Sequence, residues 1–301
     1  MAVGLMMELP THRVEAPEEF VTAAAIAEIA GAAESAGYTG VYVTDHPAPD
    51  AKWLDHGGHH ALDPFVALSF AAAATTSLSL LTNIYIAAYR NPFLSAKQVQ
   101  SLSVLSGHRF ILGVGAGYLK SEFRALGVDF DTRGALLDES LEVLRAVLGG
   151  EDTAWEGSSF SARGVRLRPA LPPATPPIWV GGNSKAAIRR AVARHEGWSP
   201  FNTFGYSATT RTAEVSDLAE LEAAIGWARS YADEIGRTAP LDVCFSAGPI
   251  LSGRRSADER RSVLERLEQI GVTHVTVDSR GDDREEVIGN LREFAADVVP
   301  D

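Results

Sequence analysis

The feature of this sequence that most restricts its fold is a regular alternation between short apolar runs and longer amphipathic stretches. Short apolar runs bounded by turn residues predict buried strands, and the stretches between them have helical length. This alternation predicts a parallel sheet with crossover helices. The runs lie at residues 3–8, 40–44, 78–84, 110–114, 177–181, 197–201, 241–245 with a tail to 251, and 272–278. Eight strands make a TIM barrel, so the predicted fold class is α/β, a (β/α)8 barrel.

Capping signals support the helices between these runs. Asp63 and Asn91 each precede a proline suited to the first helical position, and Ser256 with Glu259 forms a capping-box pattern. The interval 115–176 is too long for one loop and one helix, which predicts an insertion between strands four and five. Within it, 155–160 and 165–168 resemble a small hairpin. Without an internal repeat or a linker, residues 1–301 are predicted to form a single domain.

Composition excludes several classes of protein. The net charge of -12 repels nucleic acid and anionic membrane surfaces, so we expect no partner of either kind. Cys244 is the only cysteine, which excludes an internal disulfide, a cysteine zinc site and an iron–sulfur cluster. The start of the chain lacks the pattern of a secretory signal, and the longest apolar stretch, 66–81, is too short to span a membrane. We therefore expect a cytoplasmic protein.

Two glycine-rich turns follow predicted strands. Gly113 to Gly117 allows a close approach to a ring or a phosphate, although Tyr118 replaces the third glycine of the dinucleotide fingerprint. Gly181-Gly182-Asn183-Ser184 opens a helix and offers free amides to a phosphate. The alternatives are a tight strand-to-helix turn in the first case and simple N-capping by Asn183 or Ser184 in the second.

Asp45 and His46 lie where the second strand ends, at the face on which barrel enzymes carry catalytic groups. A histidine there exchanges protons near neutral pH, and an adjacent aspartate orients it or accepts a ligand donor. The alternative is a structural histidine with ordinary hydrogen bonds.

The loop His56-Gly-Gly-His-His60, with Asp55 and Asp63 nearby, invites a metal interpretation because imidazole and carboxylate are zinc ligands. Adjacent His59 and His60 side chains diverge in most backbones, so we assign no metal ligands and expect the loop to cover the barrel mouth. The charged segments 139–142 and 254–266 are interpreted as solvated helix faces.

Taken together, these residues resemble the bacterial luciferase-like oxidoreductases, and more narrowly the branch that uses coenzyme F420, an 8-hydroxy-5-deazaflavin. The resemblance covers most of the chain up to Phe201. It is carried by Tyr42-Val-Thr-Asp-His46, Leu62-Asp-Pro-Phe65, Leu80-Leu-Thr-Asn83, Tyr89-Arg-Asn-Pro92, Leu105-Ser-Gly-His-Arg-Phe110, Leu112-Gly-Val-Gly-Ala-Gly-Tyr118, Glu122-Phe123, Leu126-Gly-Val-Asp-Phe130 and Pro177-Ile-Trp-Val-Gly-Gly182.

The resemblance implies a deazaflavin across the carboxyl-terminal mouth of the barrel. It implies a cis peptide at Asn83-Ile84 that supports the ring, Asp45 at the cofactor and His46 as the proton donor. It also implies Ala116 and Gly117 beside the ring. The phosphate-binding turn then comprises Gly181, Gly182 and Ser184, with Asn183 between them. Tyr118 stands where some F420-dependent sugar-phosphate dehydrogenases have glutamate, so such a substrate is not expected; this tyrosine donates a hydrogen bond or packs on the ring.

The function that follows is hydride transfer between C5 of F420 and an unidentified organic substrate. Trp53, Tyr85, Tyr89 and Trp198 are expected as apolar walls, and Arg90, Lys185 and Arg189 as a basic strip for the anionic polyglutamate tail. The alternatives are an FMN-dependent monooxygenase using oxygen, a metal-dependent barrel hydrolase using His56, His59 or His60, and a barrel that only binds a ligand. A homodimer is expected from the resemblance.

Overall fold

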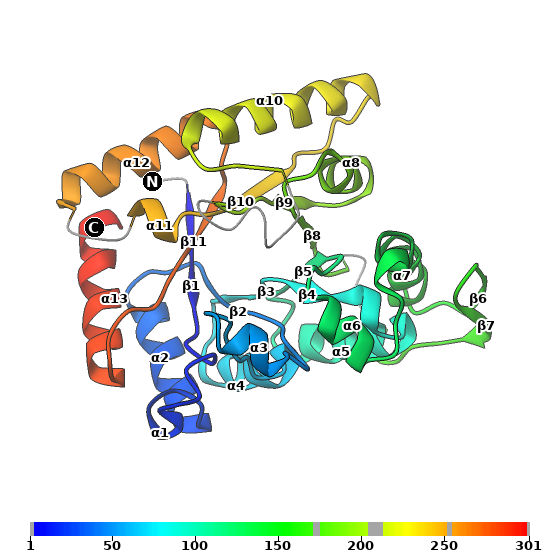
Figure 1. Ribbon diagram of the computed structural model, residues 1–301, viewed down its shortest axis with the longest axis horizontal. Coiled ribbons are helices and arrows are strands. Elements are labelled where there is room, and N and C mark those ends of the chain that lie inside the picture. The colour runs from blue at the N-terminus through cyan, green and yellow to red at the C-terminus, as the bar shows by residue number, and fades with distance from the viewer. Residues whose placement is uncertain (1–2, 171–174, 204–212, 252–254, 300–301) are drawn as a thin grey trace.

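The computed structural model describes residues 3–170, 175–203, 213–251 and 255–299. In these ranges, eight parallel strands close into a barrel surrounded by helices, as predicted (Figure 1). Around the ring the strands follow the order β3, β2, β1, β11, β10, β9, β8 and β5, and pairing of β3 with β5 closes it. The strands are β1 (Gly4–Glu8), β2 (Gly40–Val43), β3 (Ser79–Thr82), β5 (Phe110–Gly115), β8 (Ile178–Gly181), β9 (Gly197–Ser199), β10 (Asp242–Ser246) and β11 (His274–Val277).

One long helix follows each barrel strand. The predicted starts are confirmed: Asp63 accepts the amides of Phe65 and Val66, Asn91 accepts that of Phe93, and Ser256 with Glu259 forms the capping box. The helices are α2 (Ala23–Ser35), α4 (Pro64–Ala74), α5 (Pro92–Leu105), α7 (Arg133–Leu148), α8 (Lys185–Arg194), α10 (Leu218–Glu234), α12 (Ala257–Ile270) and α13 (Arg284–Val298). In the part of the chain that is described, none is long and apolar enough to cross a bilayer.

The barrel core has two layers, and a third, separate cluster packs around Phe123. The larger one lies between the strands and the surrounding helices. The smaller one fills the inside of the barrel with one side chain from each of six strands: Met6, Tyr42, Leu81, Ile111, Trp179 and Cys244. Because the interior is packed, a ligand has room at an end of the barrel and not along its axis.

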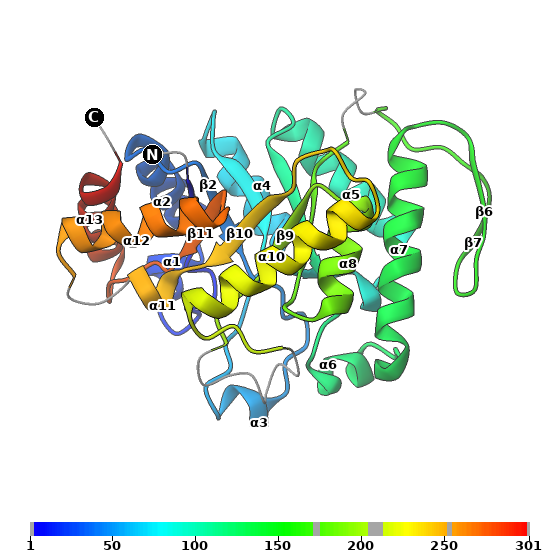
Figure 2. The same cartoon turned by 90° about the horizontal axis from the view of Figure 1, so that it is seen from above.

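The predicted insertion between strands four and five is present. It contains α6 (Lys120–Ala125), η2 (Phe130–Thr132) and a hairpin of β6 (Thr153–Glu156) and β7 (Ser161–Val165), which stands away from the barrel in both views (Figures 1 and 2). The expected hairpin register was wrong. Thr153 pairs with Val165 and Glu156 with Ser161, so the second strand ends at Val165, where it was predicted to begin.

The interpretation of segment 139–142 as a solvated face was wrong for Glu139. Its side chain is buried and accepts hydrogen bonds from Trp155 Nε1, the Ser158 hydroxyl and the amides of Ser159 and Phe160. A carboxylate without partners would be costly to bury, and these donors offset that cost. Glu139 therefore ties the hairpin to α7.

Two strand ends also differ from expectation. The predicted tail of the seventh strand is instead a short helix, α11 (Gly248–Leu251). The third strand ends at Thr82, is followed by a cis peptide between Asn83 and Ile84 as expected, and continues as β4 (Tyr85–Ile86) and η1 (Ala87–Tyr89). The chain thus bends just where the third strand reaches the mouth.

Short helices in the connections that follow strands surround the carboxyl-terminal mouth. These are α1 (Pro17–Phe20), α3 (Ala51–Leu54), α6 and α11. Figure 2 shows α3 and α6 on the same side of the molecule, although distant parts of the sequence contribute them. The end of the barrel at which the strands finish is therefore where side chains from separate segments meet.

Candidate active site at the barrel mouth

Asp45 follows β2 and is buried against the bend after the third strand. Its Oδ2 accepts the Ile86 amide at 2.9 Å and Arg90 Nη1 at 2.6 Å, and its Oδ1 accepts Arg90 Nη2 at 2.9 Å. Such a two-pronged guanidinium–carboxylate pair is directional as well as strong. The Asp45–Arg90 pair holds the segment after the cis peptide against the end of β2.

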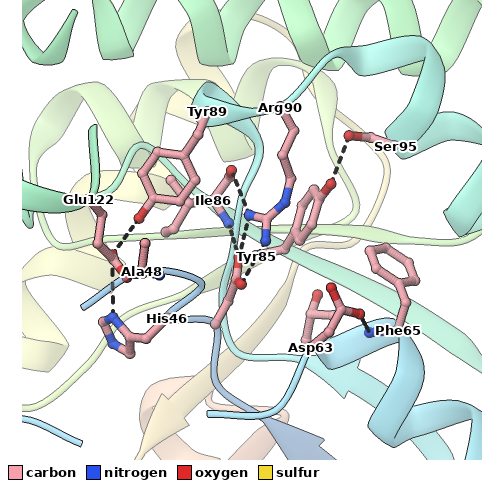
Figure 3. Close-up of polar contacts among 12 residues, drawn as sticks. His46, Ala48, Asp63, Phe65, Tyr85, Ile86, Tyr89, Arg90, Ser95 and Glu122 are labelled. Atoms are coloured by element: carbon pink, nitrogen blue, oxygen red, sulfur yellow. Dashed lines mark hydrogen bonds and ion pairs between the residues drawn. The ribbon is translucent and has the colours of Figure 1, made fainter. Parts of the chain in front are cut away.

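His46 faces a buried glutamate (Figure 3). Its Nδ1 lies 3.4 Å from Oε2 of Glu122, on α6. That same oxygen accepts the Tyr89 hydroxyl at 2.7 Å, and Oε1 accepts the Ala48 amide at 3.3 Å. Two segments that follow different strands, one with His46 and Ala48 and one with Tyr89, therefore converge on a carboxylate from a third.

Electrostatics keep Glu122 ionised. Burial alone would raise the pKa of this carboxyl, but the His46 ring, the Tyr89 hydroxyl and the Ala48 amide outweigh it, so the pKa is lowered. Burial, followed by the charge of Glu122, raises the pKa of Tyr118 to about 12. Tyr118 is therefore a neutral hydrogen-bond donor near pH 7, with its ring centroid 6.2 Å from that of His46.

The loop that contains α3 covers His46, as predicted. The ring centroid of His46 lies 4.6 Å from that of Trp53 and 4.8 Å from that of His59. His59 Nδ1 donates to the His60 carbonyl at 2.9 Å. Burial lowers the pKa of His59, and the neighbouring His46 and His12 rings lower it further against the opposing effect of that carbonyl. His59 is thus a neutral ring at neutral pH.

A second histidine–glutamate pair lies after β1. His12 Nδ1 is 3.4 Å from Glu8 Oε1, and the His12 ring centroid is 5.8 Å from that of His59. Burial would lower the pKa of His12, but the adjacent Glu8 carboxylate outweighs it, so the pKa is raised. Burial and the charge of Glu8 raise the pKa of Asp278, after β11.

A cradle of small residues lies beside these groups. A Cβ at Gly115 would fall 2.3 Å from Ile84 Cδ1, and one at Gly181 would fall 2.5 Å from the same atom. Ile84 therefore packs into space that only glycine leaves open on β5 and β8. Gly117 has φ +80°, and the partly exposed Ala116 precedes it. This arrangement fits a flat ring resting on Asn83-Ile84 and the Ala116–Gly117 turn.

The turn after β8 is organised mainly by protein contacts. Ser184 caps α8 by accepting the Ala187 amide, and Gly182 has φ +114°. The Asn183 side chain donates to the carbonyls of Phe201 and Ala213 and accepts the Phe201 amide, so it braces the turn. The N-cap alternative is correct for Ser184, whereas Asn183 does not cap the helix.

Several expected wall residues lie elsewhere. Tyr85 and Trp198 are fully buried, and their polar atoms bond to Ser95 and to the Gly182 carbonyl, so the expectation that they line an open pocket was wrong. Arg90 is engaged by Asp45 and is not part of a basic strip. Lys185 and Arg189 are exposed on α8, over the Trp227 ring.

Sequence reasoning missed the roles of three groups. Glu122 was quoted in a motif without a function, and His12 and Glu8 were not singled out. For Glu122, the signal in the sequence was an acidic residue beside a phenylalanine in a short helix. The residues that contact its carboxylate come from other segments, so this signal does not reveal them.

The histidine loop does not form a metal cluster. His56 and His60 are exposed, whereas His59 turns toward His46. Over the described residues, no group of three or more histidine, cysteine, aspartate or glutamate side chains is arranged to hold a metal ion. The hydrolase alternative therefore gains no support from the geometry.

Comparison with known proteins shows the family of the chain and agrees with the fold. The family model for luciferase-like monooxygenases matches residues 5–297. This chain belongs to that family. Proteins similar to it include an uncharacterised protein of Mycobacterium tuberculosis, 31% identical over 90% of this chain and 93% of its own. An F420-dependent hydroxymycolic acid dehydrogenase of the same organism is 30% identical over 60% of this chain and 49% of its own.

Solved luciferase-like structures share the fold. The F420-dependent tetrahydromethanopterin reductase of Methanopyrus kandleri superposes with a TM-score of 0.74 at 18% identity, covering 100% of this chain and 99% of that one. A type II Baeyer–Villiger monooxygenase of Pseudomonas putida, solved with FMN, superposes with a TM-score of 0.75 at 17% identity and the same coverage. The chain is thus a luciferase-like oxidoreductase by family, and its relatives and structural neighbours include proteins described with F420 and with FMN.

Proposed function

We propose that this luciferase-like protein is an F420-dependent oxidoreductase whose single barrel domain binds the deazaflavin across its mouth. The observation that carries the proposal is that the glycine-rich turn adjoins the His46–Glu122 pair. A Cβ at Gly117 would fall 2.9 Å from the ring of Phe123, the residue that follows Glu122. When bound, the deazaflavin supplies a hydride acceptor or donor at C5. The F420-dependent relatives favour this cofactor over FMN.

The protein's own contribution is positioning and proton transfer. The segment Asn83-Ile84, the turn Ala116–Gly117 and Tyr118 would support the ring, and the turn Gly181–Ser184 would hold the phosphate. Asp45 keeps the bend after the third strand in place through Arg90. His46 would exchange the proton of an alcohol-to-carbonyl conversion, in which the substrate C–H bond gives up a hydride and its O–H bond gives up the proton.

The substrate pocket would be bounded by the covering loop. Trp53, His59 and Tyr118 surround His46 with aromatic faces, which suit a bulky and weakly polar substrate. Cys244, the one cysteine, is buried and free. Because a single cysteine forms no internal disulfide, a cytoplasmic location is part of the proposal.

Titration with F420 and, separately, FMN tests the cofactor by quenching of intrinsic tryptophan fluorescence. Micromolar or tighter F420 binding with little FMN binding is the expected result. The double variant Lys185→Glu, Arg189→Glu should weaken F420 more than FMN, because only F420 has the polyglutamate tail. Arg163→Glu on the exposed hairpin, which makes the same charge change as either single substitution, is the control for Lys185→Glu and Arg189→Glu taken singly. Preference for FMN, with oxygen uptake, would instead support the monooxygenase alternative, and binding without any turnover would support a ligand-binding barrel.

We also propose that the protein is a homodimer joined through α4 and α5. These neighbouring helices contain one charged residue, Lys97, in a chain of net charge -12. Val66 and Phe70 on α4 and Leu94 and Leu105 on α5 are exposed apolar side chains. Two acidic copies approach with least repulsion through such a face, which has the uncharged character of an interface core.

Light scattering coupled to gel filtration tests the dimer. Wild type should have twice the chain mass, and the double variant Phe70→Lys, Leu94→Lys should run as a monomer. Ile235→Lys, at another exposed apolar position that follows α10, should leave the mass unchanged. A monomeric wild type would refute the proposal.

A further inference from the structure

Glu122 is the most deeply buried carboxylate at the mouth, with a side-chain exposure of 1%. Burial of an ionised carboxylate is unfavourable unless donors surround it. Tyr89 and Ala48 supply two donors, and both come from segments with fixed positions: η1 follows the bend after the third strand, and Ala48 follows β2. The carboxylate is thus held from two sides before His46 is considered.

The His46 ring has one buried nitrogen directed at this carboxylate. Within the described residues, Nδ1 makes no hydrogen bond of good geometry, and Glu122 Oε2 at 3.4 Å is its ion-pair neighbour. Such contacts are often long in ligand-free sites and shorten when substrate binds. An ionised carboxylate only accepts hydrogen bonds, so a ring nitrogen facing it has to carry the proton.

We infer that Glu122, held by Tyr89 and Ala48, is a positioning residue that fixes His46 as its Nδ1–H tautomer and presents Nε2 to the substrate. In a neutral imidazole one nitrogen donates and the other accepts, and the partner of one decides the state of the other. With Nδ1 committed to Glu122, Nε2 carries the lone pair that receives a substrate proton. The inference rests on the proposed function for the identity of that proton, whereas the tautomer is a property of the protein alone.

The chain contains matched controls for both supporting residues. Glu139 is a second buried glutamate that accepts several hydrogen bonds, but it lies at the hairpin and not at His46. Tyr85 is a second buried tyrosine of the same segment, and its hydroxyl contacts Ser95 instead of Glu122. Substitutions at these positions remove the same chemistry without touching the pair.

The test is nitrogen-15 NMR of the ligand-free protein with labelled histidine, recorded at a pH where the rings are neutral. The His46 signals are assigned by their loss in His46→Gln. Wild type should show the Nδ1–H pattern for His46, and Glu122→Met should shift it toward Nε2–H, while Glu139→Met leaves it unchanged. A wild-type ring in the Nε2–H form would overturn the inference even if Glu122→Met does not fold, and so would a Glu122→Met spectrum identical to wild type.

Turnover gives a second readout. With F420 and a panel of secondary alcohols, Glu122→Met should lower kcat by roughly 10²-fold with little change in F420 affinity, because the proton acceptor is misoriented but the cradle is intact. Tyr89→Phe should lower kcat less, and Tyr85→Phe should not lower it. If wild type does not bind F420, the proposed function fails while the tautomer measurement still decides the role of Glu122.

Discussion

The two histidine–glutamate pairs at the mouth have the same nitrogen–oxygen separation but different surroundings. His46 and Glu122 are 10% and 1% exposed, whereas His12 and Glu8 are 27% and 15% exposed. Glu122 accepts two further hydrogen bonds, from Tyr89 and Ala48. We therefore expect Glu122 to orient its histidine more firmly than Glu8 does, because other donors already hold the Glu122 carboxylate.

The pairs also differ in what surrounds the histidine. His46 is enclosed by Trp53, His59 and Tyr118, whereas His12 shares its environment with a second acid, Asp278. The first arrangement suits a reaction at a desolvated nitrogen. The second suits a group whose charge follows the pH of the solvent.

The strongest test of the difference between the two pairs is to replace each histidine in turn. His46→Gln should lower kcat on secondary alcohols with F420 by roughly 10²–10⁴-fold, because a general acid–base group contributes about that much. His12→Gln should leave kcat close to wild type. F420 affinity, followed by fluorescence, should be retained in both. A larger loss in His12→Gln than in His46→Gln would reverse the assignment of the two pairs.

Removing each carboxylate should separate the pairs in stability. Glu122→Met leaves the Tyr89 hydroxyl and the Ala48 amide buried without their acceptor, so the free energy of unfolding should fall by about 1–3 kcal/mol. Glu8→Met breaks a partly exposed contact and should cost less than about 1 kcal/mol. Urea unfolding curves at pH 7 measure both values. Equal losses would show that the extra donors on Glu122 contribute nothing.

The pH dependence of the two pairs should have opposite signs. The pKa of Glu122 is lowered in the fold, so its stabilising contribution is present above the unfolded pKa of about 4.3 and is lost as pH falls through the folded value. The pKa of His12 is raised, so its contribution is present below the unfolded pKa of about 6.5 and is lost as pH rises through the folded value.

Urea curves across a pH series test these signs through differences between wild type and variant. The difference in free energy of unfolding between wild type and Glu122→Met should become smaller on acidification. The corresponding difference for His12→Gln should become smaller between neutral and mildly alkaline pH. Two differences that change in the same direction would contradict the distinction.

The smallest expected effect is at Asp278. Burial and Glu8 raise the pKa of this carboxyl, so its ionised form opposes folding once pH rises through the folded value. Asp278→Asn should therefore raise the free energy of unfolding at pH 7 by less than about 0.5 kcal/mol, because the Asp278 side chain still reaches solvent, which screens its charge although neighbouring atoms partly desolvate it. The gain should vanish near pH 3. A loss of stability at pH 7 would show that the Asp278 charge is favourable.

Much of the fold was predictable because local signals decide it. The eight apolar runs became strands, and Asp63, Asn91 and Ser256 cap the helices that they were expected to start. The hairpin register was not predictable, because Glu139 on another element holds the turn between its strands. Tertiary contacts from distant segments override local pattern there.

The site was predictable in part. The segment Asp45–His46 and the cis peptide at Asn83-Ile84 follow from motif and resemblance. The role of Glu122 does not, since its donors come after β2 and in η1 and are brought together only by closure of the barrel. Tyr85 was misjudged for the same reason: an aromatic residue at a strand end has no local signal that tells the core from the mouth.

Ile84 connects the cradle to the strands around it. Its side chain fills the space beside Gly115 on β5 and Gly181 on β8, and its backbone lies in the bend between β3 and β4. A ring bound on Ile84 would therefore contact, through this one side chain, the ends of β3, β5 and β8, and it would reduce the motion of these strands relative to one another. Bound ligand should slow amide hydrogen exchange in β3, β5 and β8 together. Hydrogen exchange in these strands would then show whether the mouth is occupied.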